Sequence, residues 1–154
     1  MDIAALVAWV LTAGGGFVMV ARWVSAGGLR QQQDGSTRFP APLVFGHAGL
    51  AAAGLVVWIA YLALDADTLP WVAVGLVVVV ALLGFTLFAR WLPSRRTVAA
   101  SAGAAGSGRG RAGTAGTGAD PAERHLPVPV VAAHGVFAVA TLVLVVLAAV
   151  QAGS

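Results

Sequence analysis

Four long apolar stretches alternate with shorter polar segments along the chain. At 1.5 Å per residue, each stretch is long enough to cross roughly 30 Å of hydrocarbon as a helix. The stretches are continuously apolar, whereas the strands of a membrane barrel alternate between apolar and polar residues. The pattern therefore predicts an all-α protein, an integral membrane four-helix bundle. The expected spans are Ile3 to Val24, Pro42 to Leu64, Pro70 to Leu92 and Pro127 to Val150.

The composition agrees with a membrane protein and excludes several kinds of site. Of the 154 residues, 59% are hydrophobic and 10% are charged. The chain has no cysteine, so disulfides, thiolate metal sites and cysteine nucleophiles are excluded. The net charge of +3 fits loops that face anionic lipid, and we expect no nucleic-acid partner. All nine basic residues are arginine in a chain rich in Gly, Ala and Val, which suggests a bacterial gene of high GC content.

The arginines predict the orientation of the spans. All of them lie around two of the three connections, and the other side carries Asp2, Asp65, Asp67 and an uncharged carboxyl end. The positive-inside rule then places both termini outside the bacterial plasma membrane, in a multi-pass protein. The arginines of the first connection are Arg22, Arg30 and Arg38, and those of the last are Arg90, Arg95, Arg96, Arg109, Arg111 and Arg124.

The last connection has its own composition. From about residue 94 to 120 it consists almost entirely of Gly, Ala, Ser, Thr and Arg. Such a segment cannot form a hydrophobic core, so we expect a flexible cytoplasmic linker. Its glycines follow no strand and match no Walker pattern, which argues against a nucleotide site.

Two sequence patterns occur twice. G-F-x-x-x-A-R-W begins at Gly16 and again at Gly84, and P-x-P-x-V-x-x-H begins at Pro40 and again at Pro127. This duplication predicts two tandem helical hairpins within a single membrane domain of residues 1–154, one over about 1–66 and one over about 67–154. Because each hairpin has two spans, the copies share one orientation and should be related by an axis along the membrane normal.

The repeated residues include a histidine in the second and fourth spans. The symmetry places His47 and His134 at equal depth, in one layer with Gly16 and Gly84. Ionisable side chains within spans are costly and usually mark a site or pair with a partner. Neutral imidazole is a good axial ligand of haem iron, and two histidines on facing helices would hold a macrocycle between them.

Small residues around the histidines would leave room for such a ring. Ala51 and Ala138 follow the histidines by one helical turn, and the two glycines offer clearance from the neighbouring helices. The haem propionates would then point to the cytoplasmic side, where arginines can pair with them. The arginines concerned are Arg22, Arg90 and Arg38.

In this layer the sequence resembles membrane b-type cytochromes, four-helix proteins in which histidines ligate haem. The resemblance is one of architecture, and the chain as a whole is similar to small four-span membrane proteins of high-GC bacteria. It implies haem b as the cofactor, with His47 and His134 as iron ligands. With three histidines in the chain, one haem is the limit. The implied role is electron transfer or redox chemistry at the cytoplasmic leaflet, with quinone or a redox partner protein, and any catalysis would be that of an oxidoreductase.

Other interpretations of the same residues stay open. The two histidines would serve equally as donors of interhelical hydrogen bonds, each worth about 1 kcal/mol or less. The chain would then be a structural or accessory subunit of a larger membrane complex, or a small-solute carrier without a cofactor. Copper or zinc at the pair would be an incomplete site that a homodimer could complete.

Aromatic residues and arginines near the span ends have a simpler interpretation. Arg22 and Arg90 each precede a tryptophan, and such a pair is a common anchor at the membrane interface. Near the outer ends, the sequence predicts a belt of aromatic side chains at the interface. Its expected members are Trp9, Trp58, Tyr61 and Trp71.

Overall fold

The four apolar stretches form four long helices, as their length predicts. In the computed structural model these are α1 (Asp2–Ser25), α3 (Ala41–Leu64), α4 (Leu69–Ala105) and α5 (Val128–Ala152). The connections contain the short helix α2 (Gly28–Gln33) and the 3-10 helix η1 (Ala122–His125). The structure describes residues 1–64, 66–105 and 120–153, and the side chains of residues 95–105 are left out of the description.

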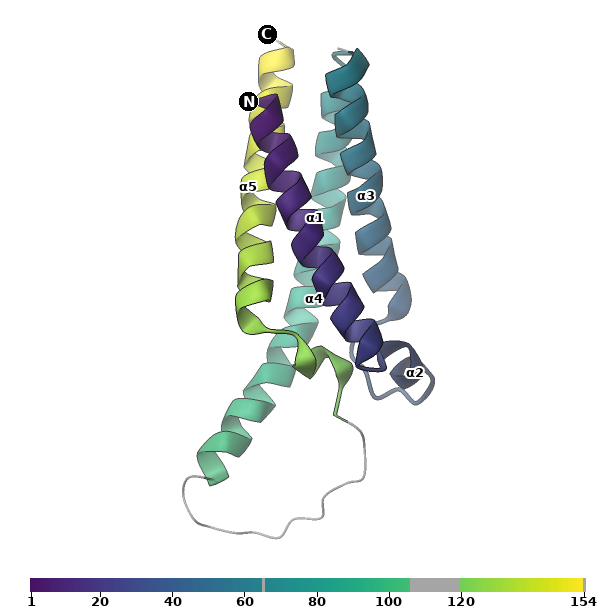
Figure 1. The fold of residues 1–154 in the computed structure, drawn as a ribbon, viewed down its shortest axis with the longest axis vertical. Coiled ribbons are helices and arrows are strands. Elements are labelled where there is room, and N and C mark those ends of the chain that lie inside the picture. The colour runs from purple at the N-terminus through teal and green to yellow at the C-terminus, as the bar shows by residue number, and fades with distance from the viewer. Residues whose placement is uncertain (65, 106–119, 154) are drawn as a thin grey trace.

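The long helices form a bundle whose two ends differ (Figure 1). Helix α1 packs mainly along α5, and α3 mainly along α4, with smaller contacts between α1 and α3 and between α4 and α5. The two chain termini lie together at one end, and α2 and η1 lie at the other. We call these the terminal end and the cap end.

Each long helix has the length and hydropathy of a candidate membrane span. The best 18-residue windows have mean hydropathies between 1.9 and 2.8. At most 17% of any such window is buried inside the bundle, so most of the apolar surface points outward. Phe17 and Phe85, for example, are 75% and 71% exposed. A surface of this kind is stable in hydrocarbon and costly in water.

The core at the terminal end is built from aromatic residues. Trp9, Trp58 and Tyr61 are buried there, and the indole nitrogen of Trp58 donates a hydrogen bond to the carbonyl of Asp2 at 3.3 Å. The sequence-based expectation that these three belong to an interfacial belt is therefore wrong. Their rings pack among side chains of Ala, Val and Leu from the neighbouring helices. Trp71, in contrast, is half exposed, as a belt residue would be.

The part of the last connection that follows residue 94 directly is helical. Helix α4 continues through Pro93 to Ala105, where the sequence predicts a flexible linker from about residue 94. Residues 106–119 lie outside the described part of the chain. The linker ends at η1, which is held to α2 because the Gln31 side chain bonds both the carbonyl of Asp120 and the amide of Ala122.

The packing of Trp9 on α3 depends on Gly54, which gives a test of the fold. A Cβ atom at Gly54 would lie 2.7 Å from the Trp9 ring, whereas one at Gly49 on the same helix would meet nothing within 4 Å. We expect Gly54→Ala to lower the free energy of unfolding in detergent by about 1–3 kcal/mol through overpacking. Gly49→Ala should leave it unchanged or raise it by up to about 1 kcal/mol. Equal effects of the two substitutions on thermal unfolding would contradict this packing.

Candidate functional site

His47 and His134 lie next to each other inside the bundle. His47 is on α3 and His134 on α5. Their ring centroids are 6.3 Å apart, and the ring planes are inclined at 65°. Both rings are partly buried. The sequence prediction that the two histidines share one layer is therefore confirmed by their contact.

A backbone carbonyl on a neighbouring helix orients each imidazole. Nδ1 of His47 is 3.0 Å from the carbonyl oxygen of Val80 on α4, and Nδ1 of His134 is 2.9 Å from that of Thr12 on α1. A carbonyl oxygen can only accept a hydrogen bond, so Nδ1 carries the proton and donates it. In the neutral ring, Nε2 is then left with its lone pair available to a ligand.

Glycines let the imidazoles approach these carbonyls. A Cβ atom at Gly84 would lie 3.0 Å from Cε1 of His47, and one at Gly16 would lie 3.2 Å from Cε1 of His134. Gly15 also adjoins the His134 ring. The sequence predicts that the clearance at Gly16 and Gly84 accommodates a bound macrocycle. In the structure, the nearest groups to these glycines are the histidine rings themselves.

A large apolar cavity surrounds the two histidines. Its volume is about 1000 Å³, and all four long helices contribute to its wall. The predicted site residues that line it are His47, His134, Gly16, Gly84, Ala51 and Ala138. Trp9 and Leu142 border it toward the terminal end, and Trp23, Phe39 and Leu126 border it toward the cap end. Phe39 and Leu126 could not be predicted as wall residues from the sequence, because both lie in connections.

The cavity is open at its sides. Phe17 on α1 and Phe85 on α4 line it and are nevertheless largely exposed on the outer surface. Both therefore stand where the interior of the bundle meets its surroundings. The two residues occupy the same position in the repeated G-F-x-x-x-A-R-W pattern.

Hydroxyl groups border the histidine layer on the side of the terminal end. Oγ1 of Thr12 and Oγ1 of Thr141 are 3.0 Å apart, and they join α1 to α5. Each hydroxyl also lies within 2.8 Å of a carbonyl one turn back on its own helix, Ala8 for Thr12 and Phe137 for Thr141. Both hydroxyls are therefore engaged in contacts within the bundle.

The predicted arginines lie near the cap end but outside the cavity wall. Arg22, Arg38 and Arg90 are exposed. The guanidinium of Arg90 on α4 donates a hydrogen bond to the carbonyl of Arg38, which lies before α3, at 3.2 Å. The structure thus brings six of the nine predicted residues around one cavity and leaves the three arginines at the surface.

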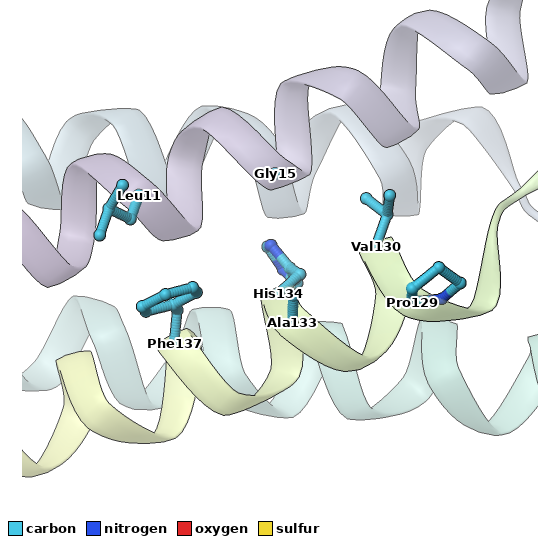
Figure 2. Close-up of a pocket in the computed structure, with 7 residues that line it drawn as sticks. All are labelled: Leu11, Gly15, Pro129, Val130, Ala133, His134 and Phe137. Atoms are coloured by element: carbon cyan, nitrogen blue, oxygen red, sulfur yellow. The ribbon is translucent and has the colours of Figure 1, made fainter.

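A second, smaller groove touches the site from outside. It has a volume of about 330 Å³ and runs between α1 and α5. Figure 2 shows His134 pointing from α5 toward Gly15 on α1, with Val130 and Phe137 on either side along α5. His134 lines both the groove and the central cavity, so its ring forms part of the wall that separates them.

The described residues offer no conventional metal cluster. Among them, no group of three or more His, Cys, Asp or Glu side chains lies close enough together to hold a metal ion. Comparisons of the chain with protein-family models, curated proteins and solved structures find no match. The function must therefore be inferred from the site itself.

The hydrogen bonds of the two imidazoles predict a definite tautomer. In a long-range ¹H–¹⁵N spectrum of the protein labelled with ¹⁵N-histidine, we expect His47 and His134 to be neutral and protonated on Nδ1. Gly84→Ala should displace the His47 ring and change its nitrogen shifts while leaving those of His134 in place. Gly135→Ala, whose Cβ would meet nothing within 4 Å, should change neither. Nε2-protonated rings would contradict the assigned bonds.

Proposed function

We propose that this chain is an integral membrane protein that binds one b-type haem between His47 and His134. The observation that carries the proposal is the histidine pair inside a large apolar cavity, with each Nδ1 bonded to a carbonyl and each Nε2 left over. Ligand cavities in proteins commonly have volumes of about 300–1,000 Å³ and mostly apolar walls. The cavity around the histidines is at the upper end of this range and suits a large, flat, apolar molecule.

The separation of the two rings fits a shared metal ion. A metal–imidazole bond is about 2 Å long, so two nitrogens on opposite sides of one ion put their ring centroids roughly 6 Å apart. The observed separation is 6.3 Å. Two histidines alone form an incomplete site for copper or zinc. For haem iron, His47 and His134 would supply both protein ligands, because the macrocycle supplies the others.

The carbonyl bonds support the ligand role further. Histidines that ligate a metal almost always donate their other ring proton to a carboxylate, a carbonyl or water, which fixes the ring and raises its basicity. Val80 and Thr12 provide such carbonyls to His47 and His134. The same bonds would also serve a purely structural histidine pair, and in that case the chain acts as a structural or accessory subunit. Haem binding itself decides between the two.

The contacts of the site support the tandem repeat. His134 of the second repeat contacts Gly16 of the first, and His47 of the first repeat contacts Gly84 of the second. The helix pairs that correspond under the repeat, α1 with α5 and α4 with α3, are also the two most extensive interfaces. We infer two parallel hairpins related by a twofold axis, and the histidine pair would lie on or near that axis.

The orientation in the membrane follows from the arginines. In the described part of the chain they all lie at the cap end, which the positive-inside rule assigns to the cytoplasm. Both termini would then face the outside of a bacterial plasma membrane. The cavity extends toward the cap end, so carboxylates of a bound haem would find cations on the cytoplasmic side.

The two histidines determine what chemistry the site could support. Haem supplies one-electron chemistry when it is bound. Because both axial positions would be filled by His47 and His134, the arrangement favours electron transfer over the binding of oxygen. Phe17 and Phe85 line the cavity and are exposed on the outer surface of the bundle, where a quinone in the bilayer would approach the site. We also propose a redox partner protein and a second copy of the chain as binding partners.

Substitution of the histidines tests the proposal. The protein purified in detergent from cells supplied with a haem precursor should show a sharp Soret band, with α and β bands that grow on reduction. His47→Ala and His134→Ala should each abolish the low-spin spectrum, because each removes one axial ligand. His125→Ala is the matched control, since the third histidine is exposed at the cap end and should leave the spectrum unchanged.

A colourless wild-type protein would refute haem binding and favour the structural interpretation. Low-spin spectra retained in both His47→Ala and His134→Ala would show that haem is bound elsewhere. Insertion into the membrane should be unaffected in all three variants, because the spans keep their hydropathy.

The arginines at the cap end allow a second test. If Arg22 and Arg90 pair with the propionates, Arg22→Gln and Arg90→Gln should each lower the reduction potential of bound haem, because the loss of a nearby cation disfavours the added electron. We expect each substitution to lower the potential by at most about 60 mV, which corresponds to a tenfold change in a one-electron equilibrium. Arg30→Gln on α2 serves as the control. Potentials equal to that of the control would leave Arg22 and Arg90 as interfacial anchors.

A further inference from the structure

Glu123 in η1 is a carboxylate buried at the cap end. Its side chain is fully covered, with 0% of its surface exposed. One carboxylate oxygen accepts a hydrogen bond from Oγ1 of Thr37 at 2.9 Å, and the other accepts one from the backbone N–H of Arg38, also at 2.9 Å. A buried charge of this kind is costly unless its oxygens are hydrogen-bonded. Both oxygens of Glu123 have a donor.

These two bonds join the first connection of the chain to the last. Thr37 and Arg38 lie between α2 and α3, whereas Glu123 follows the long segment after α4. The hydroxyl of Thr37 also accepts a hydrogen bond from the amide of Phe39 at 3.2 Å, so the series of hydrogen bonds that starts at the Glu123 carboxylate continues to Phe39. On the other side, the amide of Leu126 bonds the carbonyl of Glu123 at 3.4 Å.

Phe39 and Leu126 are the two residues of the connections that line the central cavity. Both are buried, with 6% and 5% of their surface exposed, and they belong to the apolar cluster that closes the cap end together with Trp23 and Trp91. Glu123 is thus linked by hydrogen bonds to the backbone of both residues that cover this end of the cavity. Its carboxylate reaches the amide of Phe39 through Thr37, and its main-chain carbonyl accepts from the amide of Leu126.

We propose that Glu123 is a positioning residue that latches the cap, holding Phe39 and Leu126 across the cytoplasmic end of the cavity and so controlling the passage of a cofactor through that end. The latch itself is independent of what the cavity binds. Its effect on a bound haem rests on the proposed function. Hydrogen bonds to a charged acceptor are about twice as strong as neutral ones, which explains why a carboxylate is used here.

The absence of cysteine from the sequence allows a direct measurement of cap opening. With Leu126→Cys as the single thiol, a water-soluble maleimide should label the purified full-length protein slowly, because the thiol reacts when the cap opens. Adding Glu123→Gln keeps the shape of the side chain but replaces the charged acceptor of both bonds by a neutral amide, whose NH₂ group cannot accept the hydroxyl proton of Thr37 and weakens the latch. We expect labelling to become at least about tenfold faster.

Matched variants test whether the effect belongs to the latch. Thr37→Val should accelerate labelling as Glu123→Gln does, and Thr37→Ser, which keeps the hydroxyl, should not. Asp34→Asn removes an exposed carboxylate from the same connection and should have no effect. A thiol placed at Ala73, which is fully buried at the terminal end, should stay slow to label in the Glu123→Gln protein.

Two results would overturn the latch. The first is a labelling rate of Leu126→Cys that neither Glu123→Gln nor Thr37→Val changes. The second is an equal acceleration of labelling at Ala73→Cys, which would mean that the whole bundle has loosened. A separate measurement follows transfer of haem to excess apomyoglobin. Glu123→Gln should accelerate this transfer by a similar factor, and an unchanged transfer rate would show that haem does not pass the cap. If the wild type binds no haem, the proposed function fails, while the labelling rates still decide the latch.

Discussion

The hydrogen bond from a histidine ring to a carbonyl of the neighbouring helix is the interaction on which the centre of this structure depends. It occurs twice, from His47 to Val80 and from His134 to Thr12. In hydrocarbon, helices gain little by burying apolar side chains against one another, so close packing and interhelical hydrogen bonds hold them together. The two bonds occupy the larger interfaces of the bundle, α3 with α4 and α1 with α5. Each requires a glycine opposite the ring.

These bonds also determine the chemistry that remains. With Nδ1 committed to a carbonyl, each ring offers Nε2, and the two rings are neighbours across the bundle. The residues around them are too small to fill the space between four helices, so a cavity is left there. Tryptophans border it at both ends, Trp9 on one side and Trp23 on the other. The interior is therefore packed at its ends and hollow in its middle.

The cap end shows how a small helical bundle can close such a cavity with its connections. Two glutamines of α2 bond backbone groups of both connections: Gln31 holds the segment before η1, and Gln32 holds Phe39 and Ala41. Glu123 completes the arrangement from the other side. These bonds pair both backbone groups of Phe39 and the amide of Leu126, the two residues of the connections that line the cavity.

The sequence by itself determined the four helices, because an apolar run of this length has to form its backbone hydrogen bonds within itself. It also determined the histidine layer, because a repeated pattern places corresponding residues at the same depth in the bundle. Six of the predicted site residues, from Gly16 to Ala138, meet around one cavity for this reason. The tertiary structure alone decided which histidine contacts which glycine, because the hydrophobic pattern of the sequence does not say which helices pack side by side. It also placed Trp9, Trp58 and Tyr61 inside, because a ring fills whatever gap its neighbours leave. The contacts of Glu123 join residues more than eighty positions apart, and such a pairing becomes visible only when the chain has folded.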